Sequence, residues 1–284
     1  MSETSAPRAC VVGWPIAHSR SPLIHNYWLR KLGLAGSYDR AAVPPGAFPA
    51  FAASIGKDGL VGANVTVPHK EDAFAACDKL TATAAELGAV NTLWREGRAL
   101  CGDNTDVAGF LDNLDDEAPR WREQADAAII LGAGGAARAV IAGLLSRRIE
   151  RLFIVNRTPD RAERLVERFG ARASAHSWRD LPRLLESAGL LVNTTSLGMV
   201  GQKPLAIDLS PLPPQAAVAD LVYVPLETPL LATARGRGLR AVSGLGMLLH
   251  QAAPGFERWF GARPTVTPEL RALIEADILK SSER

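Results

Sequence analysis

Short apolar runs and amphipathic stretches alternate along this chain, and their periods predict its secondary structure. In the first third, the predicted strands span residues 9–13, 38–43, 63–67 and 89–94. A helix is predicted to start at Ser21, interpreted as its N-cap, with Pro22 at the first position. Its expected apolar face consists of Leu23, Ile24, Tyr27, Trp28 and Leu32. Two further helices are predicted over residues 72–80 and 83–87.

The second half shows a more regular alternation. Residues 115–119 are acidic and end in proline, which predicts a linker or a domain edge. Strands are then predicted over 127–131, 152–155, 190–193, 218–222 and 239–242, and helices over 136–145 and 160–169. Strands separated by helices imply a parallel sheet with right-handed crossovers. From Gly244 onward, two more helices and no further strand are predicted.

Composition narrows the class of protein. The chain has 284 residues, 47% of them hydrophobic and 22% charged, which is typical of a globular protein of one or two domains. A net charge of +2 argues against nucleic acid or an anionic membrane as the main partner, and no apolar run approaches the ~18 residues of a membrane span. With a polar N-terminus, the expected location is the cytoplasm. The three cysteines and five histidines lack metal-ligand spacing, so no metal site is predicted.

A glycine-rich segment follows the predicted strand 127–131. Gly132-Ala133-Gly134-Gly135-Ala136-Ala137 matches the dinucleotide fingerprint G-x-G-x-x-G/A between a strand and a helix. Gly132 would permit the tight turn, Gly134 would let the backbone approach a pyrophosphate, and Ala137 would let helix and strand pack. The helix N-terminus would add free N–H groups and a partial positive charge. The alternative is a purely structural turn.

The residues after the next predicted strand bear on which dinucleotide binds. An NAD site usually has an acidic residue there, whereas this chain has Asn156-Arg157-Thr158-Pro159-Asp160-Arg161. Thr158 is predicted to cap the next helix, so Arg157 and Arg161 would flank a helix N-terminus and suit a 2′-phosphate. The sequence therefore predicts NADP(H), with two solvated surface arginines as the alternative.

Two polar segments end in side chains of opposite charge. Asn64-Val65-Thr66-Val67-Pro68-His69-Lys70 ends in a cation, and Gly102-Asp103-Asn104-Thr105-Asp106 ends in an anion. If the fold brings Lys70 and Asp106 together beside an alcohol or ketone, the pair can pass one proton while a hydride moves elsewhere.

These segments together resemble the shikimate dehydrogenase family, whose members reduce 3-dehydroshikimate with NADPH in aromatic amino-acid (chorismate) biosynthesis. The resemblance covers nearly the whole chain. The remaining matching segments are Ser19-Arg20-Ser21-Pro22 with His25-Asn26, Gly88-Ala89-Val90-Asn91-Thr92, Asn193-Thr194-Thr195-Ser196-Leu197-Gly198-Met199, Asp220-Leu221-Val222-Tyr223, and Gly244-Leu245-Gly246-Met247 through Gln251.

The resemblance implies roles for particular residues. Lys70 corresponds to the catalytic lysine, and Asp106 would orient Lys70 and bind the same alcohol. Ser19 and Ser21 would hold the substrate carboxylate. The other implied substrate ligands are Thr66, Asn91, Asp106, Tyr223 and Gln251. The implied cofactor-binding residues are Gly132, Ala133, Gly134, Gly135, Ala136, Asn156, Arg157, Thr158, Arg161, Thr194, Leu221 and Gly244.

The resemblance also implies an α/β fold of two domains. Residues 1–113 with 247–284 would form an N-terminal α/β substrate domain to which the C-terminal helices return, and residues 114–246 a Rossmann-like doubly wound NADP domain. The expected enzyme is an NADP-dependent alcohol dehydrogenase, monomeric or homodimeric. Its alternatives are a quinate/shikimate dehydrogenase with relaxed substrate or NAD use, and a non-catalytic NADP-responsive binding protein. Ser21 favours shikimate, because some relatives that accept quinate carry threonine there.

Overall fold

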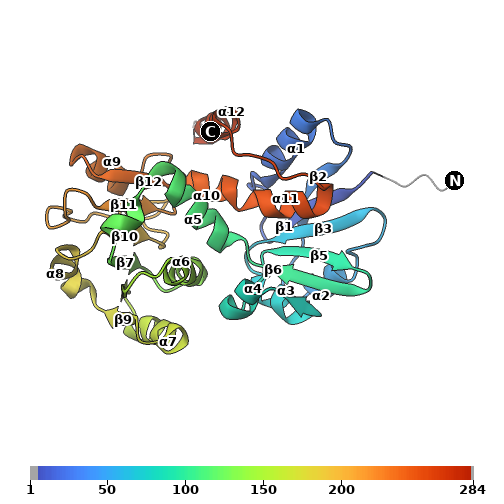
Figure 1. Ribbon diagram of the computed structural model, residues 1–284. Coiled ribbons are helices and arrows are strands. Elements are labelled where there is room, and N and C mark those ends of the chain that lie inside the picture. The colour runs from blue at the N-terminus through green and yellow to red at the C-terminus, as the bar shows by residue number, and fades with distance from the viewer. Residues whose placement is uncertain (1–5, 283–284) are drawn as a thin grey trace. The chain divides into compact units, whose positions relative to one another are not determined.

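A computed structural model describes residues 6–282 and the side chains of residues 6–281. The described chain forms two compact units (Figure 1). Unit 1 comprises the residues up to Asp106 together with Gln251–Ile274, and unit 2 comprises Val107–His250 together with the residues from Glu275. The division expected at 113/114 falls inside helix α5 (Asp106–Glu117). The ligand assigned to each domain stays a prediction.

Within the described residues, unit 1 contains a six-stranded sheet with the order β2-β1-β3-β5-β6-β4. Its strands are β1 (Arg8–Gly13), β2 (Ser37–Ala42), β3 (Leu60–Val65), β4 (Lys79–Leu80), β5 (Thr92–Glu96) and β6 (Ala99–Asp103). β1 pairs in parallel with β2 and β3, whereas β5 is antiparallel to both β3 and β6. The carboxyl ends of β1 and β3 therefore lie side by side at one edge of the sheet.

Helices cover the sheet of unit 1. They are α1 (Ser21–Leu32), α2 (Phe48–Ala52), α3 (Lys70–Ala76), α4 (Ala82–Leu87) and, from the C-terminal part, α11 (Ala252–Phe260). α11 packs on this sheet, where Trp259 Nε1 donates a hydrogen bond to the Leu93 carbonyl at 3.0 Å. The predicted return of the C-terminal region to the first domain is thus confirmed for α11. The last helix, α12 (Pro268–Ser282), has residues in both units.

Unit 2 is built on a parallel sheet with the order β12-β11-β10-β7-β8-β9. Its strands are β7 (Ala127–Leu131), β8 (Arg151–Val155), β9 (Ala173–His176), β10 (Leu190–Asn193), β11 (Ala217–Asp220) and β12 (Arg240–Ser243). All five neighbouring pairs are parallel. In this doubly wound order, β8 and β9 are added on one side of β7, and β10, β11 and β12 on the other. Such folds bind ligands where the strand order changes sides, beyond the carboxyl ends of the strands. The Rossmann-like prediction is confirmed.

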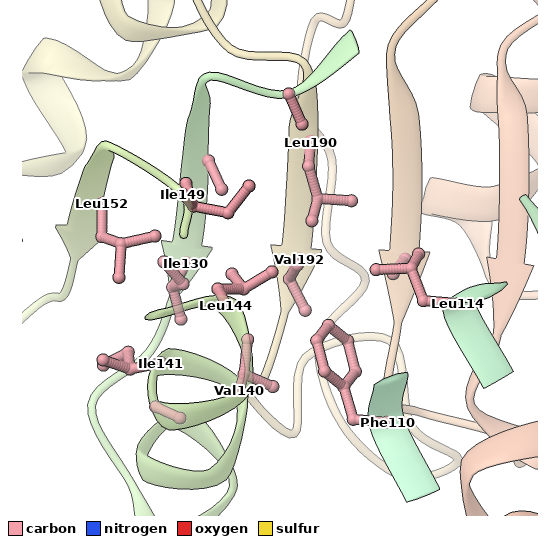
Figure 2. Close-up of a cluster of buried hydrophobic side chains, with 14 of the residues drawn as sticks. Phe110, Leu114, Ile130, Val140, Ile141, Leu144, Ile149, Leu152, Leu190 and Val192 are labelled. Carbon is pink, nitrogen blue, oxygen red and sulfur yellow. The ribbon is translucent and has the colours of Figure 1, made fainter. Parts of the chain in front are cut away.

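The core of unit 2 lies between this sheet and its helices. Figure 2 shows Val140, Ile141 and Leu144 of α6 (Gly135–Ser146) packed beside strand residues such as Ile130 and Val192, all with no exposed surface. The remaining helices are α7 (Pro159–Phe169), α8 (Leu181–Leu185), α9 (Pro229–Gly236), α10 (Gly244–His250) and the 3-10 helices Trp121–Gln124 and Trp178–Asp180. This packing fixes the glycine loop before α6 on a rigid base.

Several predictions about the first helices were wrong. Arg20, not Ser21, is the N-cap of α1, and no side-chain cap bond forms there. Leu32 is 44% exposed, because the buried stripe runs through His25 and Leu29 rather than toward the helix end. The helix predicted over 72–80 ends at Ala76, since Lys79–Leu80 pairs with β6 as β4.

Other boundaries also differ from the predictions. Residues 115–117 belong to α5 rather than to a linker, and three helices, not two, begin from Gly244 onward in the described chain. β6 and β9 were not predicted, because their sequences, ALCGD and ASAH, are short and only weakly apolar. Thr158 is the N-cap of α7 with Pro159 in the first turn, as predicted, although its side chain makes no cap bond.

Candidate functional site

Lys70 and Asp106 form an ion pair in unit 1. Their Nζ–Oδ2 distance is 2.6 Å, and the two side chains are 31% and 17% exposed. Lys70 begins α3 shortly after β3, and Asp106 begins α5 shortly after β6. The two charges that end separate polar segments of the sequence are therefore in contact, and both side chains are partly exposed.

The other carboxylate oxygen of Asp106 is held by Asn91. Asn91 Nδ2 donates to Asp106 Oδ1 at 2.9 Å. The orientation of this amide is defined, because Asn91 Oδ1 accepts the main-chain N–H of Thr105 at 2.8 Å. Asn104 Oδ1 in turn accepts the main-chain N–H of Asp106 at 3.1 Å. The carboxylate of Asp106 is thus held on both oxygens, with one of them facing the ammonium of Lys70.

His69 precedes Lys70 and has a structural environment. Its fully buried ring lies against Phe48, with 5.2 Å between the ring centroids. Nε2 lies 2.7 Å from the Val43 carbonyl, and Nδ1 lies 3.3 Å from Asp72 Oδ2. These contacts anchor the turn from which Lys70 extends.

Three hydroxyls predicted to bind the substrate, two of them to its carboxylate, lie near the carboxyl ends of β1 and β3. Ser19 lies in the loop after β1, Ser21 begins α1, and Thr66 follows β3. The two serine Oγ atoms are 3.4 Å apart, and the N–H of Ser21 points at Ser19 Oγ over 3.4 Å. The main-chain N–H of Thr66 donates to the Val12 carbonyl at 2.9 Å, which ties the two strand ends together. Open α/β sheets bind ligands at such an edge.

Gln251 and Tyr223 lie in different parts of the chain. Gln251 is the N-cap of α11 in unit 1, and its carbonyl accepts a hydrogen bond from Thr105 Oγ1 at 2.9 Å. Tyr223 follows β11 in unit 2 and is partly buried. Thr105 bonds both to Gln251 and, through its main-chain N–H, to Asn91, so it connects Gln251 to the Asn91–Asp106 group. The sequence analysis did not single out Thr105. The sequence signal was its place inside the polar run that ends at Asp106.

The glycine loop of unit 2 has the conformation that its sequence predicts. Gly132 has a φ of +106°, and a Cβ there would lie 2.8 Å from Thr194 Oγ1. A side chain is therefore excluded at Gly132 by both backbone conformation and space. Thr194 is fixed beside the loop, because its Oγ1 donates to the Leu131 carbonyl at 2.7 Å.

The next two glycines face open space. A Cβ on Gly134 or Gly135 would meet no atom within 4 Å. Gly134 is the N-cap of α6, a helix of 12 residues, so unpaired N–H groups and the positive end of the helix dipole face that space. Ala133 and Ala136 keep the loop small. These residues fit the pyrophosphate of a dinucleotide.

Two arginines flank the N-terminus of α7, directly after β8. Arg157 and Arg161 are both exposed, and Asn156 Nδ2 donates to the Thr158 carbonyl at 2.8 Å, which shapes the turn between them. β8 neighbours β7, so this turn and the glycine loop follow adjacent parallel strands. The two guanidinium groups offer charge-assisted bonds to a phosphate.

Gly244 and Leu221 form a tight contact between β11 and α10. A Cβ on Gly244 would lie 2.3 Å from the Leu221 carbonyl oxygen, so close packing alone requires glycine here. Asp220, the residue before Leu221, has a buried carboxylate that accepts hydrogen bonds from two side chains. Asn193 Nδ2 donates to Asp220 Oδ1 at 2.8 Å, and Thr228 Oγ1 donates to Asp220 Oδ2 at 2.7 Å. Burial raises the pKa of the Asp220 carboxyl, and these bonds oppose that shift. Sequence reasoning missed this buried group, which supports the loops after β10 and β11.

The cysteines are free thiols in environments that suppress their reactivity. Burial raises the pKa of Cys10 and of Cys77 to about 12 and also raises that of Cys101. A thiol acts as a nucleophile only as its thiolate, so none of the three suits catalysis near neutral pH. Within residues 6–281, no group of three His, Cys, Asp or Glu side chains has the arrangement of a metal site. No helix in the described range has the length and apolar character to cross a bilayer.

The chain matches known families over most of its length. Residues 11–93 match the shikimate dehydrogenase substrate binding domain, residues 118–200 match shikimate / quinate 5-dehydrogenase, and residues 244–268 match the shikimate 5′-dehydrogenase C-terminal domain. The NADP(+) shikimate dehydrogenase of Methylocella silvestris is 58% identical over 277 residues, which cover 98% of this chain and 99% of that protein.

Solved structures show the same relationship. Shikimate 5-dehydrogenase from Thermus thermophilus, in complex with NADP(H) and shikimate, is 36% identical with a TM-score of 0.83, covering 97% of this chain and 99% of that one. Quinate dehydrogenase from Corynebacterium glutamicum, in complex with NAD, is 28% identical with a TM-score of 0.87, covering 95% and 99%. Together with the loops and ion pair described above, these matches show that the chain belongs to the shikimate dehydrogenase family.

Proposed function

We propose that this protein catalyses the reversible, NADP-dependent reduction of 3-dehydroshikimate to shikimate in aromatic amino-acid biosynthesis. The observation that carries the proposal is the Lys70–Asp106 pair, at 2.6 Å, with its carboxylate fixed by Asn91. A pair of this kind supplies one proton at a defined point. The family relationship supports the identity of the substrate.

In this proposal, Lys70 is the proton donor for reduction. NADPH, held by residues of unit 2, would supply the hydride for the carbonyl carbon. As the carbonyl oxygen gains negative charge, the Lys70 ammonium stabilises it and transfers one proton to give the alcohol. Asp106 holds Lys70 in place and accepts a hydrogen bond from the hydroxyl of the alcohol that forms. In the oxidative direction each step reverses, and neutral Lys70 takes the proton from the alcohol.

Substrate recognition is assigned to short polar side chains of unit 1. Ser19 and Ser21 would donate hydrogen bonds to the substrate carboxylate, aided by the N-terminus of α1. Thr66, Asn91 and Gln251 would bind ring hydroxyls. Such a site discriminates strongly between polyols, because a missing hydroxyl leaves a buried polar group without a partner. Tyr223 stays a predicted substrate ligand.

Cofactor recognition is assigned to three segments of unit 2. The loop 132–136 would bind the pyrophosphate, and Asn156, Arg157, Thr158 and Arg161 would bind the 2′-phosphate. Thr194, Leu221 and Gly244 would contact the nicotinamide half. The open space above Gly134 and Gly135 supports the first assignment.

A rate assay tests the function directly. Purified protein is given shikimate or quinate, each with NADP or NAD, and formation of the reduced cofactor is followed by its near-ultraviolet absorbance. The expected result is the highest kcat/KM for shikimate with NADP. A comparable or higher value for quinate with NAD would instead support the quinate/shikimate alternative. The structural likeness to the NAD-bound quinate dehydrogenase is the reason for including this pair. No reduction with any pair would favour a non-catalytic NADP-binding protein.

The partners are therefore proposed to be small molecules. The free cysteines are typical of a reducing compartment, which supports the proposed cytoplasmic location. The proposed assembly is a monomer or a homodimer, and sedimentation of the purified protein at several concentrations tests that state.

A further inference from the structure

A chain of buried hydrogen bonds leads from the interior of unit 1 to the Lys70–Asp106 pair. It begins at Tyr38, whose side chain is completely buried and whose hydroxyl donates to Asn64 Oδ1 at 2.6 Å. Asn26 fixes the main chain of Tyr38 with two bonds, from Asn26 Nδ2 to the Tyr38 carbonyl at 2.7 Å and from the Tyr38 N–H to Asn26 Oδ1 at 3.1 Å. The hydroxyl of Tyr38 is therefore a fixed donor.

The series of hydrogen bonds continues across the sheet through Asn64 and Thr92. These residues are directly opposite each other in the antiparallel pair of β3 and β5, and they are 5% and 1% exposed. Because Asn64 Oδ1 is occupied by the tyrosine hydroxyl, its Nδ2 turns toward β5 and donates to Thr92 Oγ1 and to the Asn91 carbonyl, both at 3.3 Å. The oxygen of Thr92 thereby receives a donor, which leaves its own proton to be donated onward.

The next hydrogen bonds run from Thr92 to Asn91 and from Asn91 to Asp106. Thr92 Oγ1 donates to Asn91 Oδ1 at 2.9 Å, and Asn91 Nδ2 donates to Asp106 Oδ1 at 2.9 Å. Every donor in the series from Tyr38 to Asp106 points the same way. Successive bonds of one direction strengthen each other in a low-dielectric interior.

We propose that Thr92 is a positioning residue for catalysis: its hydroxyl, itself oriented by Tyr38 and Asn64, joins the main-chain N–H of Thr105 in holding the Asn91 amide, so that Asn91 fixes the Asp106 carboxylate against Lys70. This inference rests on the proposed function. Thr92 is proposed to act through Asn91, although its Oγ1 also lies 3.4 Å from Thr105 Oγ1, and it is assigned no contact with substrate or cofactor.

The test compares Thr92→Val, which keeps the shape but removes the hydroxyl, with Thr92→Ser, which restores it. For Thr92→Val we expect kcat for shikimate oxidation to fall roughly tenfold, because one hydrogen bond that orients Asn91 is lost. KM for NADP should not change, because the cofactor residues lie in unit 2. The solvent deuterium isotope effect on kcat should rise, since a misplaced pair makes proton transfer slower relative to other steps. Thr92→Ser should recover most of both values.

Two further variants separate positioning from a loss of stability. Thr267→Val removes another partly buried threonine hydroxyl of unit 1, one that accepts the Leu270 N–H at 3.3 Å, and should leave kcat and the isotope effect as in wild type. Tyr38→Phe removes the first donor of the series and should shift both values in the same direction as Thr92→Val, by less. If Thr92→Val does not fold, Tyr38→Phe decides the question.

The outcomes distinguish the inference from the function on which it rests. An active wild type with unchanged kcat and isotope effect in Thr92→Val, or in Tyr38→Phe where that variant decides, overturns the positioning role and leaves the function intact. A fall in kcat that Thr92→Ser does not recover, or that Thr267→Val reproduces, also overturns it. A wild type that does not oxidise shikimate with NADP overturns both proposals.

Discussion

At the scale of single residues, the candidate site depends on which partners hold each charged group. The sequence indicated Lys70 and Asp106 as a pair, because each ends a polar run. It did not indicate that Thr92 faces Asn64, since that contact depends on the register of β3 against β5. Likewise, Ser21 was taken for an N-cap from its type alone, and the structure instead makes it the first residue of α1. Residue type predicts chemistry, whereas partners depend on the fold.

His25 carries the clearest pH dependence at this scale. Its ring is fully buried and stacks on Tyr38 with 3.9 Å between centroids, and burial lowers its pKa from 6.5 to about 3. Between those two values the unfolded chain binds a proton that the folded chain excludes. The free energy of unfolding should therefore decrease as the pH falls below about 6.5, at up to about 1.4 kcal/mol per pH unit from this residue.

Urea unfolding at a series of pH values checks this expectation in wild type and in His25→Phe, which keeps a stacked ring. The variant should show a shallower loss of stability in mildly acidic solution, whatever its stability near neutral pH. His18→Phe, at an exposed histidine, should retain the wild-type slope. Equal slopes in wild type and His25→Phe would contradict the buried neutral histidine.

At the scale of elements, the unit 2 strands and helices with the strongest apolar patterns were predicted within about two residues at each end, a usual margin for element ends. The strand over Ala127–Leu131 was predicted with its observed limits, because it is continuously apolar and a glycine follows it. β4, β6 and β9 were missed, because short strands of mixed polarity are specified mainly by their neighbours in the sheet. The glycine loop was predictable both in its backbone conformation and in its position between a strand and a helix, because both depend on the local sequence.

The N-terminus of α7 permits a test of cofactor preference at this scale. Arg157→Ala should raise KM for NADP roughly tenfold or more, while KM for NAD changes little, because a lost charge-assisted bond affects only the cofactor with the extra phosphate. Arg172→Ala is a matched control, at another exposed arginine of the same unit. Steady-state kinetics with both cofactors provide the measurement. An equal rise for NADP and NAD would show that Arg157 does not recognise the 2′-phosphate.

At the scale of the whole molecule, the sequence indicated two α/β regions, and the structure has two compact units, each with its own sheet. The assignment of α11 to the first unit came only from the resemblance, because no local pattern in residues 252–260 specifies the sheet against which they pack. In the structure that assignment is visible in the bond from Trp259 to Leu93. Long-range placement of this kind depends on shape complementarity between distant segments, which a single sequence does not display.

The central claim is that Lys70 transfers the proton in a reaction whose hydride comes from a cofactor held elsewhere in the chain. The most direct measurement compares turnover and NADP affinity of Lys70→Ala with those of Lys57→Ala, a substitution at an exposed lysine of the same unit. We predict that Lys70→Ala retains NADP affinity while kcat for shikimate falls by about 10²-fold or more, and that Lys57→Ala retains both. Near-normal turnover in a folded Lys70→Ala variant would contradict the claim.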